Sequence, residues 1–170
     1  MAKKHGSNAN TGTGGRKAKV PKEHWGDQPE AHDYPAATAY LGLLCTPTDV
    51  QRLVGALERA PLEKGRAKDL LRASGLALLP PDNAHVASDL AKVASGKALS
   101  PVLLVRGNLR AGVSLTIADG YHRICASYHL DENADIPFHL VDLAPGAPAA
   151  GPRSLPSTRT RSSRSTPAAQ

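Results

Sequence analysis

The sequence predicts an α/β (α+β) fold in which helices flank a small mixed sheet, with long basic segments at both ends. Three observations predict it. Apolar residues recur at helical spacing in several stretches, short runs rich in Val, Leu and Ile have the composition of strands, and the two ends hold very few large apolar side chains. A chain of 170 residues has room for a single domain.

The two ends of the chain are expected to be disordered. Residues 1–29 form a basic arm rich in Gly, Asn, Lys and Thr, and residues 144–170 form a tail rich in Pro, Ala, Ser, Thr and Arg. Neither segment can bury enough apolar surface to offset the entropy lost on ordering. The remainder is expected to divide into a helical extension over 30–75 and a core over 76–143.

Charge is unevenly distributed along the chain. The net formal charge is +6, yet residues 1–22 and 144–170 carry ten lysines and arginines and no acids. Residues 23–143 hold all fifteen acids against eleven lysines and arginines, a formal charge of −4. Basic arms of this kind can condense on nucleic acid through counterion release. They can equally be solubilising extensions, and both interpretations stay open.

The cysteines and the amino-terminal residues bear on the compartment. Cys45 and Cys125 offer no disulfide framework and fit a reducing environment. The start Met-Ala-Lys-Lys-His-Gly is positive, as in a signal peptide, but no apolar stretch follows it. No apolar run approaches the length of a membrane span. We therefore expect a cytoplasmic protein with no membrane partner.

Two helices are predicted in the first part of the extension. One covers Ala36–Leu44 and follows Pro35. The next has the clearest start signal in the chain, with Thr46 as N-cap, Pro47 at the first helical position and Asp49 three residues after the cap. Its apolar stripe consists of Val50, Leu53, Val54 and Leu57, and Pro61 ends it.

The middle of the chain is expected to contain two further helices and a short strand between them. The first helix covers Leu62–Ser74, turns Leu70 and Leu71 inward, and ends at Gly75 as a left-handed cap. The apolar run Leu76–Leu79 is a candidate strand. Asp82 or Asn83 then caps a helix whose apolar face is Val86, Leu90 and Val93, followed by Gly96.

The last part of the chain alternates strands with one helix. Pro101–Val105 and Val113–Ile117 are predicted strands, joined by a hairpin-like connection over Arg106–Gly112. A helix is predicted over Tyr121–Leu130, and Ile136–Val141 is the closing strand.

The turn between the second of these strands and the helix is the strongest candidate site. Gly120 permits the backbone angles that a sharp strand-to-helix turn needs. The helix that follows leaves its first amide groups without partners and presents the positive end of its dipole, which suits an anion. Helical spacing predicts a buried face and places His122 and Arg123 nearer the rim; that face consists of Tyr121, Ile124, Cys125 and Tyr128.

A structural role for the same turn is about equally well supported by the pattern. Asp119 is a good N-cap residue whose carboxylate could bond the free amides itself, in the place that a phosphate would take. Arg123 could in turn pair with a carboxylate such as Asp131 or Asp135.

The motif Ile117-Ala-Asp-Gly-Tyr-His-Arg-Ile-Cys-Ala126 resembles the ParB-like nuclease and sulfiredoxin-like domain family. Leu99–Val105 before it and Ile136–Val141 after it match the strands of that pattern, so the resemblance covers about residues 76–142. In the family this turn contacts nucleotide phosphates, ATP in sulfiredoxins and CTP in partition proteins. By position, the resemblance implies ligand contacts from Gly120, Tyr121, His122 and Arg123.

Two departures restrict what the resemblance implies. Sulfiredoxins place a nucleophilic Cys where this chain has Tyr121, and Cys125 lies on the predicted buried face, so sulfinic-acid reduction is not expected. Partition proteins continue into a helix-turn-helix domain and a dimerisation domain, whereas only the tail follows residue 143, so DNA partitioning is not expected. Residues 32–75 have no counterpart in the family pattern.

The expected function is therefore the binding of a nucleotide or phosphate group. Any turnover is expected to be phosphoester hydrolysis or phosphoryl transfer, with Asp119 as base or N-cap and with His122 and Arg123 stabilising phosphate charge. His85 is a weaker candidate for a second wall of the site, and Lys92 and Arg106 are further candidate phosphate partners.

Other ligands and functions are weaker. No set of histidines and carboxylates has metal-ligand spacing, so no metal site is expected, although magnesium accompanying a nucleotide is left open. The alternative function is that of a non-catalytic accessory protein binding nucleic acid through its basic ends. A third is an interaction module that uses the helices of residues 36–75. The identity of the nucleotide and the oligomeric state are not determined.

Overall fold

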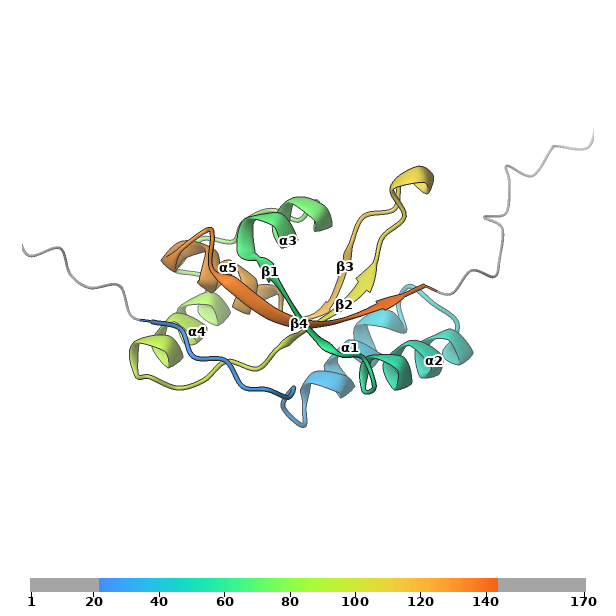
Figure 1. The fold of residues 1–170 in the computed structure, drawn as a ribbon, viewed down its shortest axis with the longest axis horizontal. Coiled ribbons are helices and arrows are strands. Elements are labelled where there is room, and N and C mark those ends of the chain that lie inside the picture. The colour runs from blue at the N-terminus through green and yellow to red at the C-terminus, as the bar shows by residue number, and fades with distance from the viewer. Residues whose placement is uncertain (1–21, 144–170) are drawn as a thin grey trace, which may run out of the picture.

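The computed structural model describes residues 22–143, and these form a mixed α/β domain (Figure 1). Five α-helices, one short 3-10 helix and four strands follow one another in this part of the chain. In chain order they are α1 (Asp33–Leu41), α2 (Pro47–Leu57), β1 (Leu62–Arg66), α3 (Ala67–Ser74), α4 (Ala84–Ala94), β2 (Val102–Arg106), η1 (Leu109–Ala111), β3 (Thr116–Asp119), α5 (Tyr121–Leu130) and β4 (Asp135–Asp142). The expected disorder of the two ends lies outside the described residues, apart from residues 22–29.

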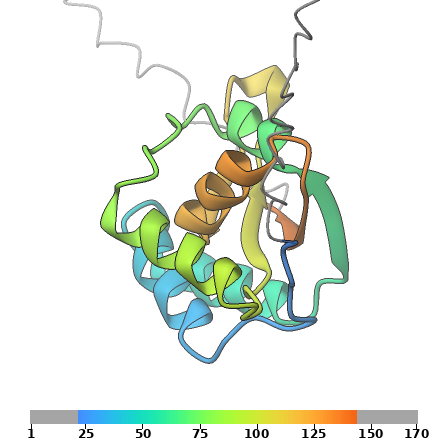
Figure 2. The same cartoon turned by 90° about the vertical axis from the view of Figure 1, so that its left-hand side faces the viewer.

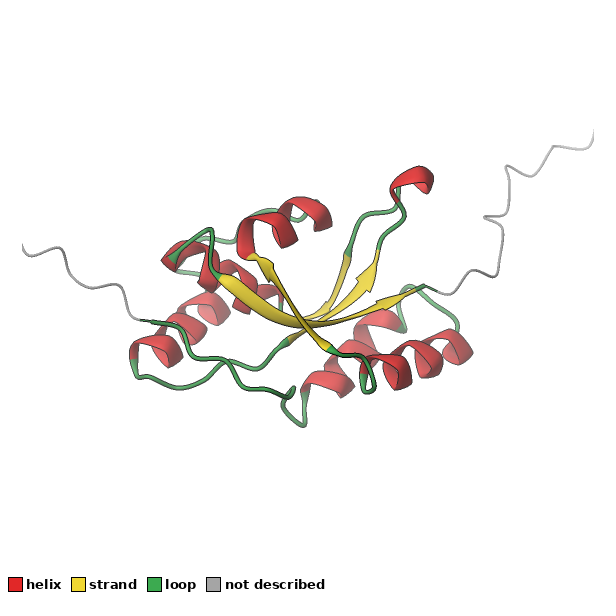
Figure 3. Ribbon diagram, in the orientation of Figure 1, coloured by secondary structure: helices red, strands yellow, loops and turns green. Residues whose placement is uncertain are grey.

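The four strands form one mixed sheet in the order β1-β4-β2-β3. The closing strand β4 lies between β1, to which it is antiparallel, and β2, to which it is parallel. β3 is antiparallel to β2 and forms the second edge of the sheet. Figure 3 shows the strands crossing the middle of the domain with helices on either side.

Helices cover both faces of the sheet, and successive side chains of β2 belong alternately to the hydrophobic core on one face and to the core on the other. Val102 and Leu104 pack in a cluster with α3, α4 and α5, while Leu103 and Val105 pack in a second cluster with α1 and α2. Figure 1 shows the same division, with α3, α4 and α5 on one side of the sheet and α1 and α2 on the other. Figure 2, turned by 90°, shows α4 (yellow-green) and α5 (orange) next to each other on the side that faces the viewer. The continuous apolar run of β2 follows from this arrangement.

The helix starts that the sequence predicted are confirmed at α2 and α4. The Thr46 hydroxyl accepts a hydrogen bond from the Asp49 amide (3.3 Å) and donates one to the Asp49 carboxylate (2.8 Å). Asn83, one of the two candidate caps of α4, accepts from the amides of His85 and Val86. α5 has the predicted bounds.

The helix predicted over Leu62–Ser74 is wrong in its first part. Residues Leu62–Arg66 form β1, which pairs with the free edge of β4, and only Ala67–Ser74 are helical. Gly65 explains why this segment fits beside β4, because a Cβ there would lie 3.0 Å from the Phe138 ring. For Leu62–Arg66, pairing with β4 in the sheet outweighs the local helix propensity of the segment.

The strand predicted over Leu76–Leu79 is also wrong. The carbonyl of Ala77 accepts a bond from the Tyr121 hydroxyl, and that of Leu79 lies 2.7 Å from Nε2 of His129. The segment pairs with no strand of the sheet, and side chains of α5 satisfy these two backbone carbonyls instead.

Smaller differences concern element boundaries and the division into domains. α1 starts at Asp33 and ends at Leu41, instead of covering Ala36–Leu44, and β3 starts at Thr116 because Val113 bridges only to Asn108. β1 belongs to the predicted extension, yet it pairs with β4 of the predicted core. Trp25, assigned to the arm, bridges to Leu99. No helix in the described part of the chain combines the length and apolar character of a membrane span.

Candidate functional site

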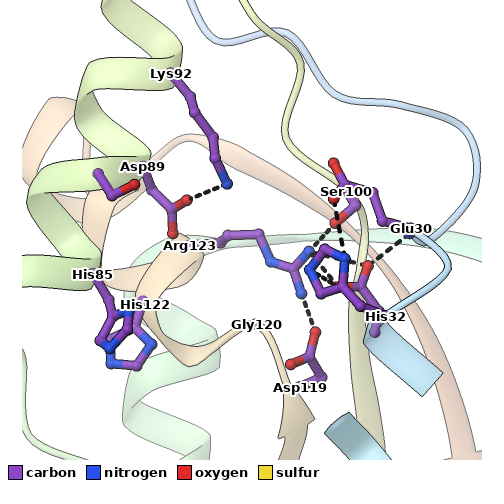
Figure 4. A pocket seen from close by; sticks show the side chains of 12 residues that line it. Glu30, His32, His85, Asp89, Lys92, Ser100, Asp119, Gly120, His122 and Arg123 are labelled. Atoms are coloured by element: carbon purple, nitrogen blue, oxygen red, sulfur yellow. Dashed lines mark hydrogen bonds and ion pairs between the residues drawn. The ribbon is translucent and has the colours of Figure 1, made fainter. Parts of the chain in front are cut away.

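A polar pocket of about 190 Å³ opens where β3 ends and α5 begins (Figure 4). The start of α1 and one face of α4 complete its walls. Nearly all of its lining residues carry an ionisable or hydroxyl side chain: Glu30, His32, Asp33, His85, Ser88, Asp89, Lys92, Ser100, Asp119, Gly120, His122 and Arg123. The pocket is thus lined by four residues of the turn and by His85, the residue expected to form a second wall of the site; the four are Asp119, Gly120, His122 and Arg123.

Gly120 shapes the turn. Its φ of +97° lies in a region that other residues rarely adopt, and an added Cβ would lie 2.8 Å from Cβ of Val102 and closer still to Cγ1. Gly120 is also the N-cap of α5, so the prediction that Asp119 caps this helix is wrong. No side chain caps α5, and its first amide with a backbone partner is that of Ile124, bonded to the Gly120 carbonyl (3.1 Å). The free amino end of α5 thus borders the pocket.

Arg123 is buried rather than placed near the rim. It is 8% exposed, and its guanidinium makes four hydrogen bonds inside the protein. Nη1 donates to both carboxylate oxygens of Asp33 (3.2 Å each) and to the Ser100 hydroxyl, and Nη2 donates to Asp119. Its partners are not Asp131 or Asp135. We call Arg123, Asp33, Asp119 and Ser100 the Arg123 clamp.

Asp33 joins α1 to this clamp. It is the first residue of α1 and only 1% exposed, and it also accepts a hydrogen bond from the Glu30 amide (2.8 Å). His32 lies beside it, with Nε2 3.4 Å from Asp33 Oδ1. The segment that has no counterpart in the family pattern therefore accepts two of the four hydrogen bonds of Arg123.

Asp119 shares the guanidinium with Asp33. Burial raises the pKa of Asp119, the nearby Asp33 carboxylate adds to the rise, and the Arg123 guanidinium opposes it. Two carboxylates around one guanidinium leave the clamp with a formal charge of −1 when both are ionised. The clamp therefore offers no net attraction to an anion.

His85 of α4 and His122 of α5 form a second group, the histidine pair. Their ring centroids lie 4.7 Å apart with the planes tilted by 37°, and both side chains project into the same side of the pocket (Figure 4). Burial lowers the pKa of His122, the neighbouring His85 lowers it further, and Asp89 opposes both effects. Within residues 22–143, neither ring makes a hydrogen bond or an ion pair.

One face of α4 lines the pocket above the histidine pair. Its members are spaced at i, i+3, i+4 and i+7, which places them on one side of a helix: His85, Ser88, Asp89 and Lys92. Lys92 Nζ donates to Asp89 Oδ1 at 3.0 Å. Sequence reasoning proposed only His85 and Lys92 from this face, yet the polar stripe opposite Val86, Leu90 and Val93 was a signal for all four.

The remaining sequence candidates lie elsewhere. The Tyr121 side chain does not line the pocket, since its hydroxyl bonds the Ala77 carbonyl, and the buried Cys125 beside it has a pKa raised by its burial. Burial of Ile124 and Cys125 confirms that part of the predicted α5 face. Arg106 lies outside this pocket and pairs with Asp142 at 2.6 Å.

Neither the described residues nor comparison with other proteins assigns the ligand. Among residues 22–143, no group of three or more His, Cys, Asp or Glu side chains is arranged to hold a metal ion. Comparisons of the chain with protein-family models, with curated proteins and with solved structures find no match. The ligand is therefore inferred from the pocket itself.

Proposed function

We propose that this chain is a ParB/sulfiredoxin-like domain that binds the phosphate group of a nucleotide or of another phosphorylated small molecule. The observation that carries the proposal is the uncapped amino end of α5, which borders a pocket that also contains the histidine pair and Lys92. Amide groups, an ammonium and imidazoles are donors that suit phosphate oxygens. The succession α4, β2, β3, turn, α5 and β4 follows the order of elements on which the family resemblance rests.

The size of the pocket limits how much of a ligand it can hold. Pockets that enclose drug-sized ligands usually measure about 300–1,000 Å³, and this one measures about 190 Å³. A phosphate group fits such a volume, so the rest of a nucleotide would lie along the surface outside it.

The contacts of the clamp change the roles that the sequence assigned. Arg123 already bonds Asp33, Ser100 and Asp119, so it positions the turn and does not serve as the main phosphate partner. Asp119 is held by the same guanidinium and is poorly placed to act as a base. The geometry therefore supports binding better than it supports phosphoester hydrolysis.

Calorimetric titration of ATP, CTP, GTP and pyrophosphate, each with and without magnesium and at acidic and neutral pH, tests this function. Lys92→Gln is expected to weaken the binding of a ligand by about tenfold, because a hydrogen bond to a charged group contributes about 1.5 kcal/mol or more. Lys97→Gln is the matched control, since Lys97 is an exposed lysine just beyond α4 that does not line the pocket. Absence of saturable binding by every compound would overturn the proposal.

A second function is favoured by the distribution of charge. Residues 22–143 include only one of the ten basic residues that lie at the two ends, Lys22, and the acids are confined to the middle of the chain. We propose that nucleic acid, if bound, is bound by these ends. The logarithm of the binding constant should then fall with the logarithm of salt concentration, with a slope of up to about −9 if all ten charges meet phosphates. Retention of nucleic acid by a protein lacking residues 1–21 and 144–170 would contradict this.

A further inference from the structure

We propose that the histidine pair is the proton-dependent part of the anion site, so that a dianion binds together with one proton held by His85 and His122. This inference rests on the proposed phosphate-binding function and specifies the charge state in which the site accepts its ligand.

The fixed charges of the pocket are unfavourable to an anion. Four carboxylates line it, those of Glu30, Asp33, Asp89 and Asp119, against the two permanent cations Lys92 and Arg123. With all histidines neutral, the lining has a formal charge of −2. A dianion would enter against this charge, and histidine is the side chain in this lining whose ordinary pKa lies nearest to neutral pH.

Three histidines line the pocket, and their contacts differ. His32 lies 3.4 Å from the carboxylates of both Glu30 and Asp33, and its side chain is 73% exposed. His85 and His122 have no such partner among the described residues, so a proton on either ring is not already neutralised by a carboxylate bonded to it. The pair is therefore the group whose protonation an incoming anion favours most.

The pair is expected to take up one proton rather than two. Its ring centroids are 4.7 Å apart, so a charge on one imidazole disfavours a second charge on the other. The free amides of α5 belong to the same turn as His122 and would act on the same ligand. One imidazolium, Lys92 and the amino end of α5 together can then face the anion.

Other charged and titratable groups around the histidine pair influence its uptake of a proton. On α4, Asp89 favours the charged form of His122, and Lys92, 3.0 Å from Asp89, offsets that carboxylate. On α5, Arg123 is bonded within the clamp, and the Tyr121 ring lies 5.7 Å from the His122 ring. The other walls contribute the carboxylates of Glu30, Asp33 and Asp119 and the imidazole of His32.

Sulfate is the decisive probe, because it stays a dianion throughout the pH range in which histidine titrates. The affinity of the wild-type protein for sulfate, measured by calorimetry from about pH 5.5 to about pH 8, should fall as the pH rises. The slope should approach about tenfold per pH unit where binding takes up one proton, as linkage requires. Titrations at neutral pH in two buffers of different ionisation enthalpy should show uptake of close to one proton. Inorganic phosphate serves as the second ligand.

The variant His85→Gln/His122→Gln should bind sulfate weakly and with little dependence on pH. His24→Gln is the matched control, since His24 is an exposed histidine outside the pocket, and it should keep the wild-type profile. The proton uptake of the wild-type protein tests the inference even if the double variant does not fold.

The outcomes separate this inference from the function on which it rests. If sulfate or phosphate binds with an affinity that is independent of pH, or if the pH dependence persists in a folded double variant, the inference is wrong and the phosphate-binding function stands. If neither these anions nor any nucleotide binds at any pH, the proposed function itself is wrong.

Discussion

The Arg123 clamp and the histidine pair share one pocket, and Arg123 and His122 are adjacent residues of α5. The two groups differ in their burial and in the number of hydrogen bonds that they make. Arg123 is 8% exposed, and its guanidinium bonds three side chains from three separate parts of the chain. The imidazole of His122, one residue earlier, contacts a second imidazole and makes no hydrogen bond or ion pair within the described residues. A His-Arg sequence at a helix start is thus divided into a part that holds the turn and a part that remains available.

The difference teaches that a motif does not by itself tell which of its residues meets a ligand. A long side chain can reach beneath its own helix to partners that the local sequence does not contain. Removal of one member from a buried ion pair leaves the other charged and without a partner, which is costly. Removal of an imidazole at the edge of a pocket leaves no such charge behind.

The largest effect is expected for Arg123→Leu, which leaves Asp33 and Asp119 without their cation. The free energy of unfolding should fall by about 3–5 kcal/mol, the usual consequence of breaking a buried pair. Urea unfolding followed by circular dichroism measures it. The matched control is Arg72→Leu, which removes an exposed pair with Asp69 and should cost about 0.5 kcal/mol or less. Similar losses in the two variants would mean that the clamp is not a structural element.

Gly120→Ala tests the turn that connects the two groups. The left-handed backbone and the close approach of Val102 together should cost about 2–3 kcal/mol, measured as a loss of thermal stability. Gly112→Ala is the comparison, because Gly112 also has a positive φ but no atom lies within 4 Å of an added Cβ. It should cost about 1–2 kcal/mol, the conformational part alone. A larger loss at Gly112 would contradict the tight turn.

Tyr121→Phe distinguishes an anchor of the fold from a ligand contact. Loss of the hydrogen bond to the Ala77 carbonyl should lower the free energy of unfolding by about 1 kcal/mol. Sulfate affinity should stay unchanged, since the Tyr121 side chain does not line the pocket. A variant with intact stability and weakened sulfate binding would place this tyrosine in the site after all.

The smallest effect is expected for His122→Gln, and it should depend on pH. The pKa of His122 is lowered from 6.5, mainly by burial, so the folded state resists its protonation. Above about pH 6.5, His122 is neutral in both the folded and the unfolded state and does not affect the pH dependence of stability. The free energy of unfolding then decreases as the pH falls through the folded-state pKa of His122. In buffers free of sulfate and phosphate, the variant should lose less stability than the wild type between about pH 7.5 and about pH 5.5, as urea unfolding measures. Equal losses would remove His122 as a titrating group.

The sequence predicted those parts of the fold whose signals are local. The bounds of α5 and the caps Thr46 and Asn83 follow from side chains a few residues away. β1 does not, because Leu62-Glu-Lys-Gly-Arg66 has no alternating apolar pattern and becomes a strand only through pairing with β4. Long-range pairing decides the structure of such a segment, and no local window contains it.

The site was predicted in the same uneven way. The turn and His85 were found from helix starts and from the resemblance, and they line one pocket except for Tyr121. The clamp was missed because Asp33 and Arg123 are 90 residues apart, and nothing near either residue indicates the other. Ser88 and Asp89 could have been found from the polar face of their helix, since they lie three and four residues after His85.

The place of β4 in the sheet has a consequence for how this domain forms during synthesis. The last strand of the domain lies between β1 and β2, and β1 has no other neighbour in the sheet. Until residues 135–142 have left the ribosome, β1 has no partner strand, and 76 residues, 67–142, are made between the end of β1 and the end of β4. Helices can form as they emerge, but the sheet cannot be completed strand by strand. A nascent chain stalled before residue 135 should therefore remain sensitive to protease across β1.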